Sequence, residues 1–305
     1  MNEQILAEAR RLADEVFRPN AERADQGDIN GQVAENVRLL AKAGYFGLGI
    51  SPEFGGKGAD DVTRREYTEL MASACGVTAF TQQQLHAGGG FVGGGRSEAL
   101  RREKLPLFAS GQELCGVAFS HLRRPGPRIP LVVMNASDTV EVTLNDLFLP
   151  DEYVLSERPP EALKRGDYCG ISGHVFLPLG GARGSVHYLR ALAEKRGNET
   201  FAHAAEELMR EIDACRHEAL TWSGACADQA DYKEHALHAR TAAIVLAVRA
   251  AHATVTATGG GAHLLTMPPQ RLLREAIFYT TTAQTPDVQN GTLDMLLSPE
   301  CWNQA

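Results

Sequence analysis

Residues 38–60 read RLLAKAGYFGLGISPEFGGKGAD, and this stretch decides the fold. A helical segment stops at Gly44, a residue that readily adopts the left-handed conformation found after many helices. The part that follows, SPEFGGKGAD, is rich in Pro and Gly and predicts a turn. We therefore expect one helix from about Gly31 to Ala43, a turn, and a second helix from about Asp61 to Cys75.

Helical periodicity continues on both sides of this stretch. From Glu3 to Phe17, apolar residues recur at the three- and four-residue spacing of one buried helical face. Further helices are expected over Ser97–Ala109, Gly180–Lys195, Glu199–Asp228, Tyr232–Thr258, Pro269–Thr281 and Asp287–Leu297. The run AGGGFVGGGR (87–96) lacks the Lys-Ser/Thr pair of a phosphate-binding loop, and we expect it to be a flexible loop.

The centre of the chain has a different character. From Leu114 to Leu155 strand-forming residues alternate, and Val140, Val142 and Leu144 would face one side. At about five or six residues per strand, this stretch holds roughly three or four strands, too few for an independent closed sheet. The predicted fold is mainly α, with an N-terminal helical domain (1–112), a truncated β segment (113–158) and a C-terminal helical bundle domain (159–305).

Composition narrows the range of partners. The 305 residues carry a net charge of -8, which argues against nucleic acid, because phosphate binding needs clustered Lys and Arg. We find no apolar run of about eighteen residues and no signal peptide, so we expect a cytoplasmic protein and no membrane partner. The six cysteines show no C-x-x-C spacing, and no His pair has metal-ligand spacing. We expect reduced thiols and no metal site.

Two segments resemble the acyl-CoA dehydrogenase family. Residues 38–60 are similar to the family pattern of a helix ending at a glycine before a Pro-Glu-aromatic-Gly-Gly-x-Gly turn. TATGGGAHLLTMPPQRLLREA (256–276) resembles the family's glycine pair, short loop and Pro-x-x-Arg-Leu-x-Arg-Asp/Glu-Ala segment. The resemblance implies the family's fold and a flavoprotein oxidoreductase that acts on acyl-CoA or a similar small molecule. It also implies a homo-oligomer, a dimer or tetramer.

The resemblance also indicates that the β-domain in the middle of the family's fold is shortened in this chain. PLVVMNASDTVEVTLNDLFLPDEYVL (130–155) looks like the end of the family's β-domain, and ELCGVAFSHLRRPGP (113–127) looks like its start without the usual Thr-Glu-Pro motif. Most of the strands between these segments in the family have no counterpart here. A flavin with one protein wall would lose much of the buried area that usually holds a cofactor.

The resemblance implies FAD-binding residues in the C-terminal third. Gly259 and Gly260 correspond to a turn that, in the family, lies against the flavin of a neighbouring subunit. Glycines there also let a backbone come close to a ligand, and a helix C-cap is the alternative interpretation. Thr285 and Gln289 match family positions near the flavin pyrophosphate.

The family's usual catalytic Glu falls on Ala283, which has no group that accepts a proton. Some relatives carry the carboxylate on an earlier helix, near the position of His174 here. Histidine has a suitable pKa for a general base, although a lone His near a helix start is more often structural or solvent-facing. We interpret Glu275, beside Arg274, and Asp287 as ordinary helix charges. The basic run HLRR (121–124) could meet a CoA phosphate or simply be solvated.

Two hypotheses about function stay open at this point. The first is an FAD-dependent oxidoreductase of the acyl-CoA dehydrogenase type with an atypical base or none. The second is a cofactor-free member of the fold that serves as a non-redox enzyme or as a partner subunit. A third alternative is a deletion product of a longer protein, whose newly exposed faces would make it associate.

Overall fold

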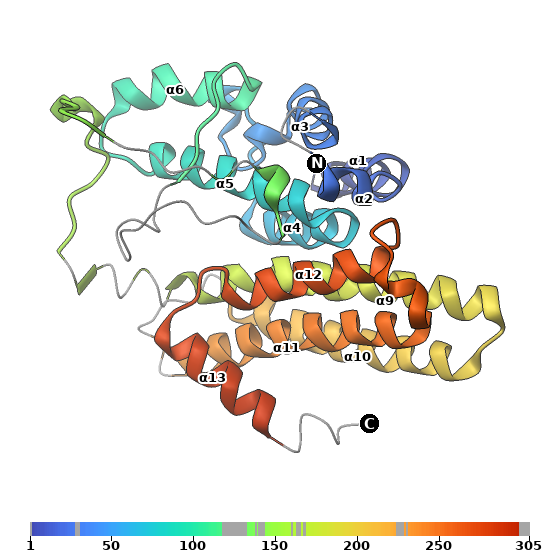
Figure 1. Cartoon of the computed structure of the whole chain (residues 1–305). Helices are drawn as coiled ribbons and strands as arrows, with labels where there is room; N and C mark the ends of the chain where they lie inside the picture. Colours follow the sequence, from blue (N-terminus) through green and yellow to red (C-terminus); the bar gives the residue numbers. More distant parts are fainter. Residues whose placement is uncertain are drawn as a thin grey trace.

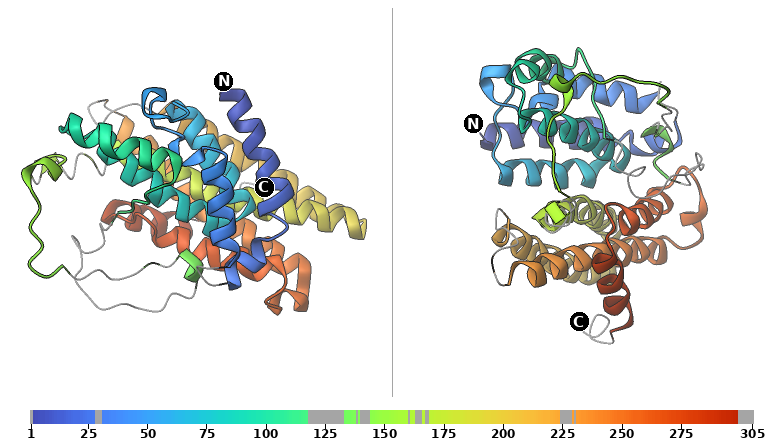
Figure 2. Two further views of the ribbon diagram at one scale, coloured as in Figure 1. Left: turned by 90° about the horizontal axis from the view of Figure 1, so that it is seen from above. Right: turned by 90° about the vertical axis from the view of Figure 1, so that its left-hand side faces the viewer.

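The computed structural model describes residues 2–27, 31–117, 133–137, 139, 144–159, 161–162, 166, 169–223, 229 and 231–298. Helices dominate these residues, which confirms the mainly α fold class. Figure 1 shows two helical layers, with the N-terminal helices on one side and the C-terminal bundle on the other. The second view in Figure 2 shows the same separation from another direction.

The N-terminal part begins with a helix that changes its pitch. Its helices are α1 (Asn2–Leu12), which continues as the π-helical turn η1 (Ala13–Phe17), α2 (Ala21–Gln26), α3 (Gln32–Lys42), α4 (Asp61–Ala74), α5 (Gly76–Gly93) and α6 (Glu98–Ser110). Gly44 follows α3 with a φ of 75°, as predicted for a left-handed residue after a helix. Asp60 caps α4, because its Oδ1 accepts a hydrogen bond from Thr63 N at 2.8 Å.

The turn between α3 and α4 holds two short 3-10 helices, η2 (Tyr45–Gly47) and η3 (Pro52–Phe54). Its glycines are needed because the backbone folds tightly on itself. A Cβ atom on Gly56 would lie 2.1 Å from the carbonyl oxygen of Ile50, a distance that no side chain tolerates. The Pro- and Gly-rich segment that decides the fold is therefore a compact turn, as predicted.

The C-terminal bundle is built around one long central helix. It comprises η6 (Ile171–Val175), α9 (Phe176–Arg196), α10 (Glu199–Thr221), α11 (Tyr232–Thr258), η7 (Gly259–His263), α12 (Pro268–Thr281) and α13 (Pro286–Leu297). Helix α11 packs against α9, α10, α12 and α13. The stretch from Tyr232 to His263 is long and apolar enough to cross a membrane, but half of its most apolar window is buried. Helix α11 is therefore the core helix of the bundle.

The two layers meet where α4 lies on α9. Two glycines of α9 allow this close approach, because a Cβ on Gly180 would lie 2.4 Å from the carbonyl oxygen of Glu69, and one on Gly184 would lie 2.6 Å from that of Ser73. The buried Glu69 side chain accepts hydrogen bonds from Arg183 Nε at 2.7 Å and from Arg216 Nε at 2.9 Å. An ion-paired contact thus joins α4 to α9 and α10.

The prediction of a flexible loop over residues 87–96 was wrong. The glycine run of 87–96 is mostly the C-terminal half of α5 and not a loop. Close packing requires glycine at one of these positions, because a Cβ on Gly88 would lie 2.6 Å from the Sγ atom of Cys115. Packing of the helix against its neighbours therefore overrides the low helix propensity of glycine. Helix α2 and the first half of α5 were not predicted at all.

The predicted strands of the middle segment fall largely outside the described residues, Val140 and Val142 among them. Where 113–158 is described, it forms turns, irregular chain and two short 3-10 helices, η4 (Asn135–Ser137) and η5 (Asp151–Tyr153), without a strand. Leu144 and Phe148 are 67% and 82% exposed, so these apolar side chains pack against no sheet face among the described residues. The basic run 121–124 also lies outside the described residues. The described cysteines Cys75, Cys115, Cys169 and Cys215 are free thiols, whereas Cys226 and Cys301 lie in undescribed parts.

Candidate functional site

One end of the bundle gathers three chain segments around Arg240 of α11. This side chain is 1% exposed. Its Nη1 donates a hydrogen bond to the carbonyl oxygen of His174 at 2.7 Å, and its Nη2 donates to those of Thr282 at 2.7 Å and Tyr279 at 3.3 Å. Burial lowers the pKa of Arg240 to about 10. Arg240 thus joins η6 to the C-terminal end of α12.

Arg240 has no ion-pair partner among the described residues. The other buried charged side chains do: Asp25 pairs with Arg274, Glu69 with Arg183 and Arg216, and Arg271 with Glu22 and Glu275. The carbonyl groups at the end of α12 carry the negative end of the helix dipole, which partly offsets the Arg240 charge. Arg240 is therefore a positive charge at this end of the bundle that no described carboxylate neutralises.

The candidate base and the family's Glu position both lie at this end. His174 belongs to η6, and its side chain is exposed to solvent. Its backbone is tied to Arg240, which in turn holds Thr282, the neighbour of Ala283. Ala283 has a φ of 50°, the left-handed region that non-glycine residues seldom adopt, and it begins the turn from α12 to α13. The structure thus links His174 and Ala283 through Arg240.

The N-terminus of α13 lies just beyond this turn. Thr285 is its N-cap, and the hydroxyl oxygen of Thr285 accepts a hydrogen bond from Val288 N at 3.3 Å. Gln289 is exposed one turn further along. Asp287 would oppose an anion here, but Lys233 Nζ of α11 lies 3.1 Å from its carboxylate. The positive end of the α13 dipole is thus open to an anionic ligand.

Gly259 and Gly260 lie at the opposite end of the bundle. Helix α12 has 14 residues and spans about 20 Å, and it separates η7 from the turn that leads to Thr285. Gly259 has a φ of 74°, which requires glycine and fits the helix C-cap interpretation. A Cβ on Gly260 would meet no atom within 4 Å, and both glycines are exposed. One chain therefore does not bring its two predicted cofactor segments together.

The interpretation of Glu275 as an ordinary helix charge was wrong. Glu275 is 1% exposed. Its Oε1 accepts hydrogen bonds from Arg271 Nη1 at 2.8 Å and from Gly76 N at 3.2 Å. Burial raises the pKa of the Glu275 carboxyl above its usual value, and the Arg271 guanidinium opposes that shift. The Glu275 carboxylate braces α12 against the start of α5 and is closed to a substrate. Asp287, by contrast, is a helix charge as predicted.

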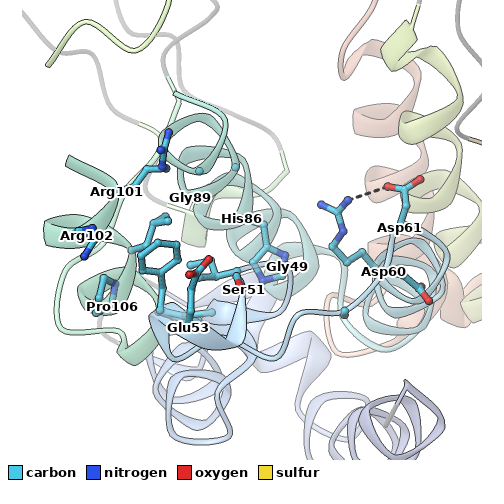
Figure 3. A pocket seen from close by; sticks show the side chains of 18 of the residues that line it. Gly49, Ser51, Glu53, Asp60, Asp61, His86, Gly89, Arg101, Arg102 and Pro106 are labelled. Atoms are coloured by element: carbon cyan, nitrogen blue, oxygen red, sulfur yellow. Dashed lines mark hydrogen bonds and ion pairs between the residues drawn. The ribbon is translucent and has the colours of Figure 1, made fainter. Parts of the chain in front are cut away.

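A cavity of about 1050 Å³ lies in the N-terminal domain, away from these residues. Its walls are the turn between α3 and α4, the start of α4, the second half of α5 and the start of α6 (Figure 3). None of the site residues predicted from the sequence lines it. The signal that could have found it is the glycine run of α5, which leaves one helix face without side chains. No group of three or more potential metal ligands occurs in the described parts of the chain.

The N-terminal domain of the chain and its overall fold are both similar to known proteins. The model of the acyl-CoA dehydrogenase N-terminal domain family matches residues 1–112. No curated protein matches the sequence. Among solved structures, the electron transferring flavoprotein of Acidaminococcus fermentans matches with a TM-score of 0.78 and 15% identity, over 97% of both chains.

Two further structures are similar over most of their length. Butyryl-CoA dehydrogenase from Megasphaera elsdenii has a TM-score of 0.77 at 16% identity, with 97% of this chain and 98% of that chain covered. The glutaryl-coenzyme A dehydrogenase complex with glutaryl-CoA has a TM-score of 0.76 at 17% identity, with 97% and 95% covered. At such identities these likenesses show the fold. The chain therefore has the fold of these dehydrogenases, and its N-terminal domain, residues 1–112, matches the acyl-CoA dehydrogenase family model.

Proposed function

We propose that this protein is an acyl-CoA dehydrogenase-like flavoprotein oxidoreductase that binds FAD between two copies of the chain and acts on an acyl thioester or a related small substrate. One observation carries the proposal. Two cofactor-type segments, one with exposed Gly259 and Gly260 and one that runs from Thr285 to the exposed Gln289, occupy opposite ends of the bundle, with α12 between them. Two copies can bring unlike ends together at one ligand, whereas one copy does not.

The residues fit FAD at its diphosphate side. The α13 N-terminus offers a helix dipole, and the charge of Arg240 acts in the same direction, while Lys233 offsets the charge of Asp287. Gly260 adds a bare backbone surface with open space before it, where a planar group can lie close. Thr285 and Gln289 of one copy and Gly259 and Gly260 of the other would hold the cofactor. FAD would supply hydride acceptance when bound.

Oxidation of an acyl thioester also requires a base that removes a proton from the substrate, and a residue of the chain must supply that base. Ala283 offers no base, so we propose His174 for this step, because its side chain is exposed at the same end of the bundle as Thr285. Arg240 would act by positioning, since it holds the His174 and Thr282 carbonyls in one place. Its charge would also favour a negative charge that develops on the substrate near this end.

A cofactor-free role is the second candidate function. The observation in its favour is the turn at Ala283, where a left-handed alanine stands at the position of the family's usual carboxylate. A chain without that base and without FAD would serve as a non-redox enzyme or as a partner subunit in a mixed oligomer. Such a chain would bind no FAD at all, and this separates the two candidates.

The decisive experiment is complementation between two variants. Gly260→Leu fills the open surface of η7, and Gln289→Ala removes an exposed amide from α13. Asn290→Ala, an exposed neighbour of Gln289, is the matched control. Each of the two test variants alone should bind FAD at least about tenfold more weakly than the wild type, and the control should bind normally.

When the two variants are refolded together, half of the dimers are mixed, and each mixed dimer has one intact site. We therefore expect about a quarter of the wild-type FAD content. A site within one chain would give no recovery, because every chain then carries one defect. No FAD binding by the wild type would instead support the cofactor-free role.

A further inference from the structure

The cavity of the N-terminal domain has no part in the proposed flavin site. Its walls belong to α4, α5, α6 and the turn between α3 and α4, and α6 lies on the side of the domain away from the bundle (Figure 1). Its volume of about 1050 Å³ is at the upper end of the range of small-molecule pockets. Buried Ile50 and Leu105 form an apolar base, together with the half-buried Phe54.

One wall of the cavity is bare helix backbone. Gly89, Gly90 and Gly93 of α5 line the cavity. A Cβ on Gly90 or Gly93 would meet no atom of the described residues within 4 Å, and neither glycine has a left-handed backbone. Each such glycine lowers helix stability relative to alanine. Neither close packing nor backbone geometry explains them. A ligand whose apolar part lies against this face does explain them.

Three arginines and four acids line the cavity, and the arginine that is free of an ion pair among the described residues is the cation open to an anion. Arg64, Arg101 and Arg102 line it. Arg102 is held by Glu98 and Arg64 by Asp61, and all four side chains are about half exposed or more, so these pairs contribute little and open easily. Arg101 makes its hydrogen bond to the carbonyl oxygen of Gly95 and has no ion pair among the described residues.

Two of the four acids of the cavity keep other partners when the arginines turn toward a ligand. Asp61 keeps Arg65 and Ser223 as partners when Arg64 turns away. Asp60 is held by Thr63 N and by Asn2. Glu98 loses its ion pair when Arg102 turns to a ligand. Glu53 is a further exception, because it has no ion pair in the described parts of the chain. It lies on the η3 wall, apart from Arg101 and Arg102 on α6 (Figure 3). Glu53 would therefore direct an anionic group toward α6.

We propose that this cavity binds an amphipathic carboxylate, an organic acid with an apolar chain. The carboxylate would meet Arg101 and Arg102 at the start of α6, where a guanidinium gives paired hydrogen bonds. The apolar chain would lie between the glycine face of α5 and the base formed by Ile50 and Leu105. This site is separate from the proposed flavin site, and it is occupied whether or not FAD binds.

Calorimetric titration of the full chain with octanoate tests the proposal, with octanol and octylamine as probes that keep the chain and change the charge. Octanoate should bind at least about tenfold more tightly than either. The double variant Arg101→Met/Arg102→Met should lower octanoate affinity by about tenfold or more, since it removes the charged hydrogen-bond donors that meet the carboxylate. The control Arg96→Met, which removes an exposed pair with Glu157 outside the cavity, should bind normally.

Gly93→Leu tests the bare helix face directly. The side chain enters open space, so the variant should melt at or above the wild-type temperature and should no longer bind octanoate. Glu53→Gln should bind octanoate more tightly, because it removes the opposing charge. The proposal is overturned if octanol binds as tightly as octanoate, if Gly93→Leu binds unchanged, or if the wild type binds none of the three probes.

Discussion

Arg240 is the residue on which the candidate end of the bundle depends. A buried guanidinium without a carboxylate partner is expensive, because burial of an unpaired charge costs several kcal/mol. The three carbonyl oxygens that it contacts belong to the end of α12 and to η6, and they offset part of that cost. The chain thus keeps a strong local charge at the point where sequence similarity places the family's reacting groups.

Replacing Arg240 by methionine should lower the free energy of unfolding by about 2–4 kcal/mol, because it leaves buried carbonyl groups without donors. Arg240→Lys keeps the charge but loses the forked geometry, and it should recover part of that loss. Urea denaturation of both variants measures the difference. Equal stability of the methionine variant and the wild type would contradict a structural role for Arg240.

His86 predicts a pH dependence of stability. Its Nε2 lies 2.7 Å from the carbonyl oxygen of Tyr45, and burial lowers its pKa from 6.5 to about 4. Between these values the unfolded chain binds a proton that the native chain does not. The contribution of neutral His86 to the free energy of unfolding is therefore fully present above pH 6.5, and it falls by up to about 3 kcal/mol as the pH drops to 4.

His86→Gln keeps a donor for the Tyr45 carbonyl and removes the titration. Its free energy of unfolding should change less than that of the wild type between pH 7 and pH 4.5, as measured by urea denaturation. An identical change in both proteins would show that His86 does not titrate in this way.

At the residue scale, sequence reasoning failed for Glu275. Its neighbour Arg274 suggested a surface charge, but the partner in the structure is Arg271, one turn earlier on α12, and the contact with Gly76 comes from 199 residues away. Spacing along a helix indicates which residues share a face. It does not indicate that another helix covers that face, so burial of this carboxylate could not be predicted.

At the scale of single elements, the sequence predicted those helices whose apolar spacing and end residues agree. Helix α11 has the predicted bounds of Tyr232–Thr258, and α3, α4, α6, α9, α12 and α13 lie within a few residues of expectation. Helix α5 was missed because glycine has low helix propensity and because its function in packing is invisible in one sequence. Helix α10 was predicted to Asp228 but ends at Thr221.

The glycines of α5 give a matched pair of substitutions. Gly88→Ala places a Cβ 2.6 Å from Cys115 Sγ, so it should destabilise the fold. Gly90→Ala enters open space and should stabilise it by about 0.5–1 kcal/mol. Thermal unfolding of both variants provides the measurement. Stabilisation by both would mean that α5 does not pack closely on the segment that carries Cys115.

At the scale of the whole molecule, the two helical layers are held together by charge as well as by packing. Glu69 of α4 is 4% exposed and pairs with arginines of α9 and α10. Sequence alone did not indicate this contact, because its partners lie more than 100 residues apart. The N-terminal domain and the bundle should therefore unfold as one unit.

Glu69→Gln should lower the free energy of unfolding by about 3–5 kcal/mol. The substitution removes a buried negative charge and leaves Arg183 and Arg216 without this ion-pair partner. Glu206→Gln, at an exposed site on α10, is the control and should change stability little. Circular dichroism and tryptophan fluorescence should report the same midpoint for each protein. A small effect of Glu69→Gln, or separate midpoints in the wild type, would contradict the joint unfolding of the two layers.

The central claim is that two copies of this chain hold FAD between unlike ends of their bundles. Its most direct test is reconstitution of the purified protein with FAD, followed by gel filtration with absorbance recorded at the protein and flavin bands together. The account predicts a flavin band that elutes with a dimer or larger assembly at about one FAD per chain. A colourless assembly, or flavin that elutes with single chains, would contradict it.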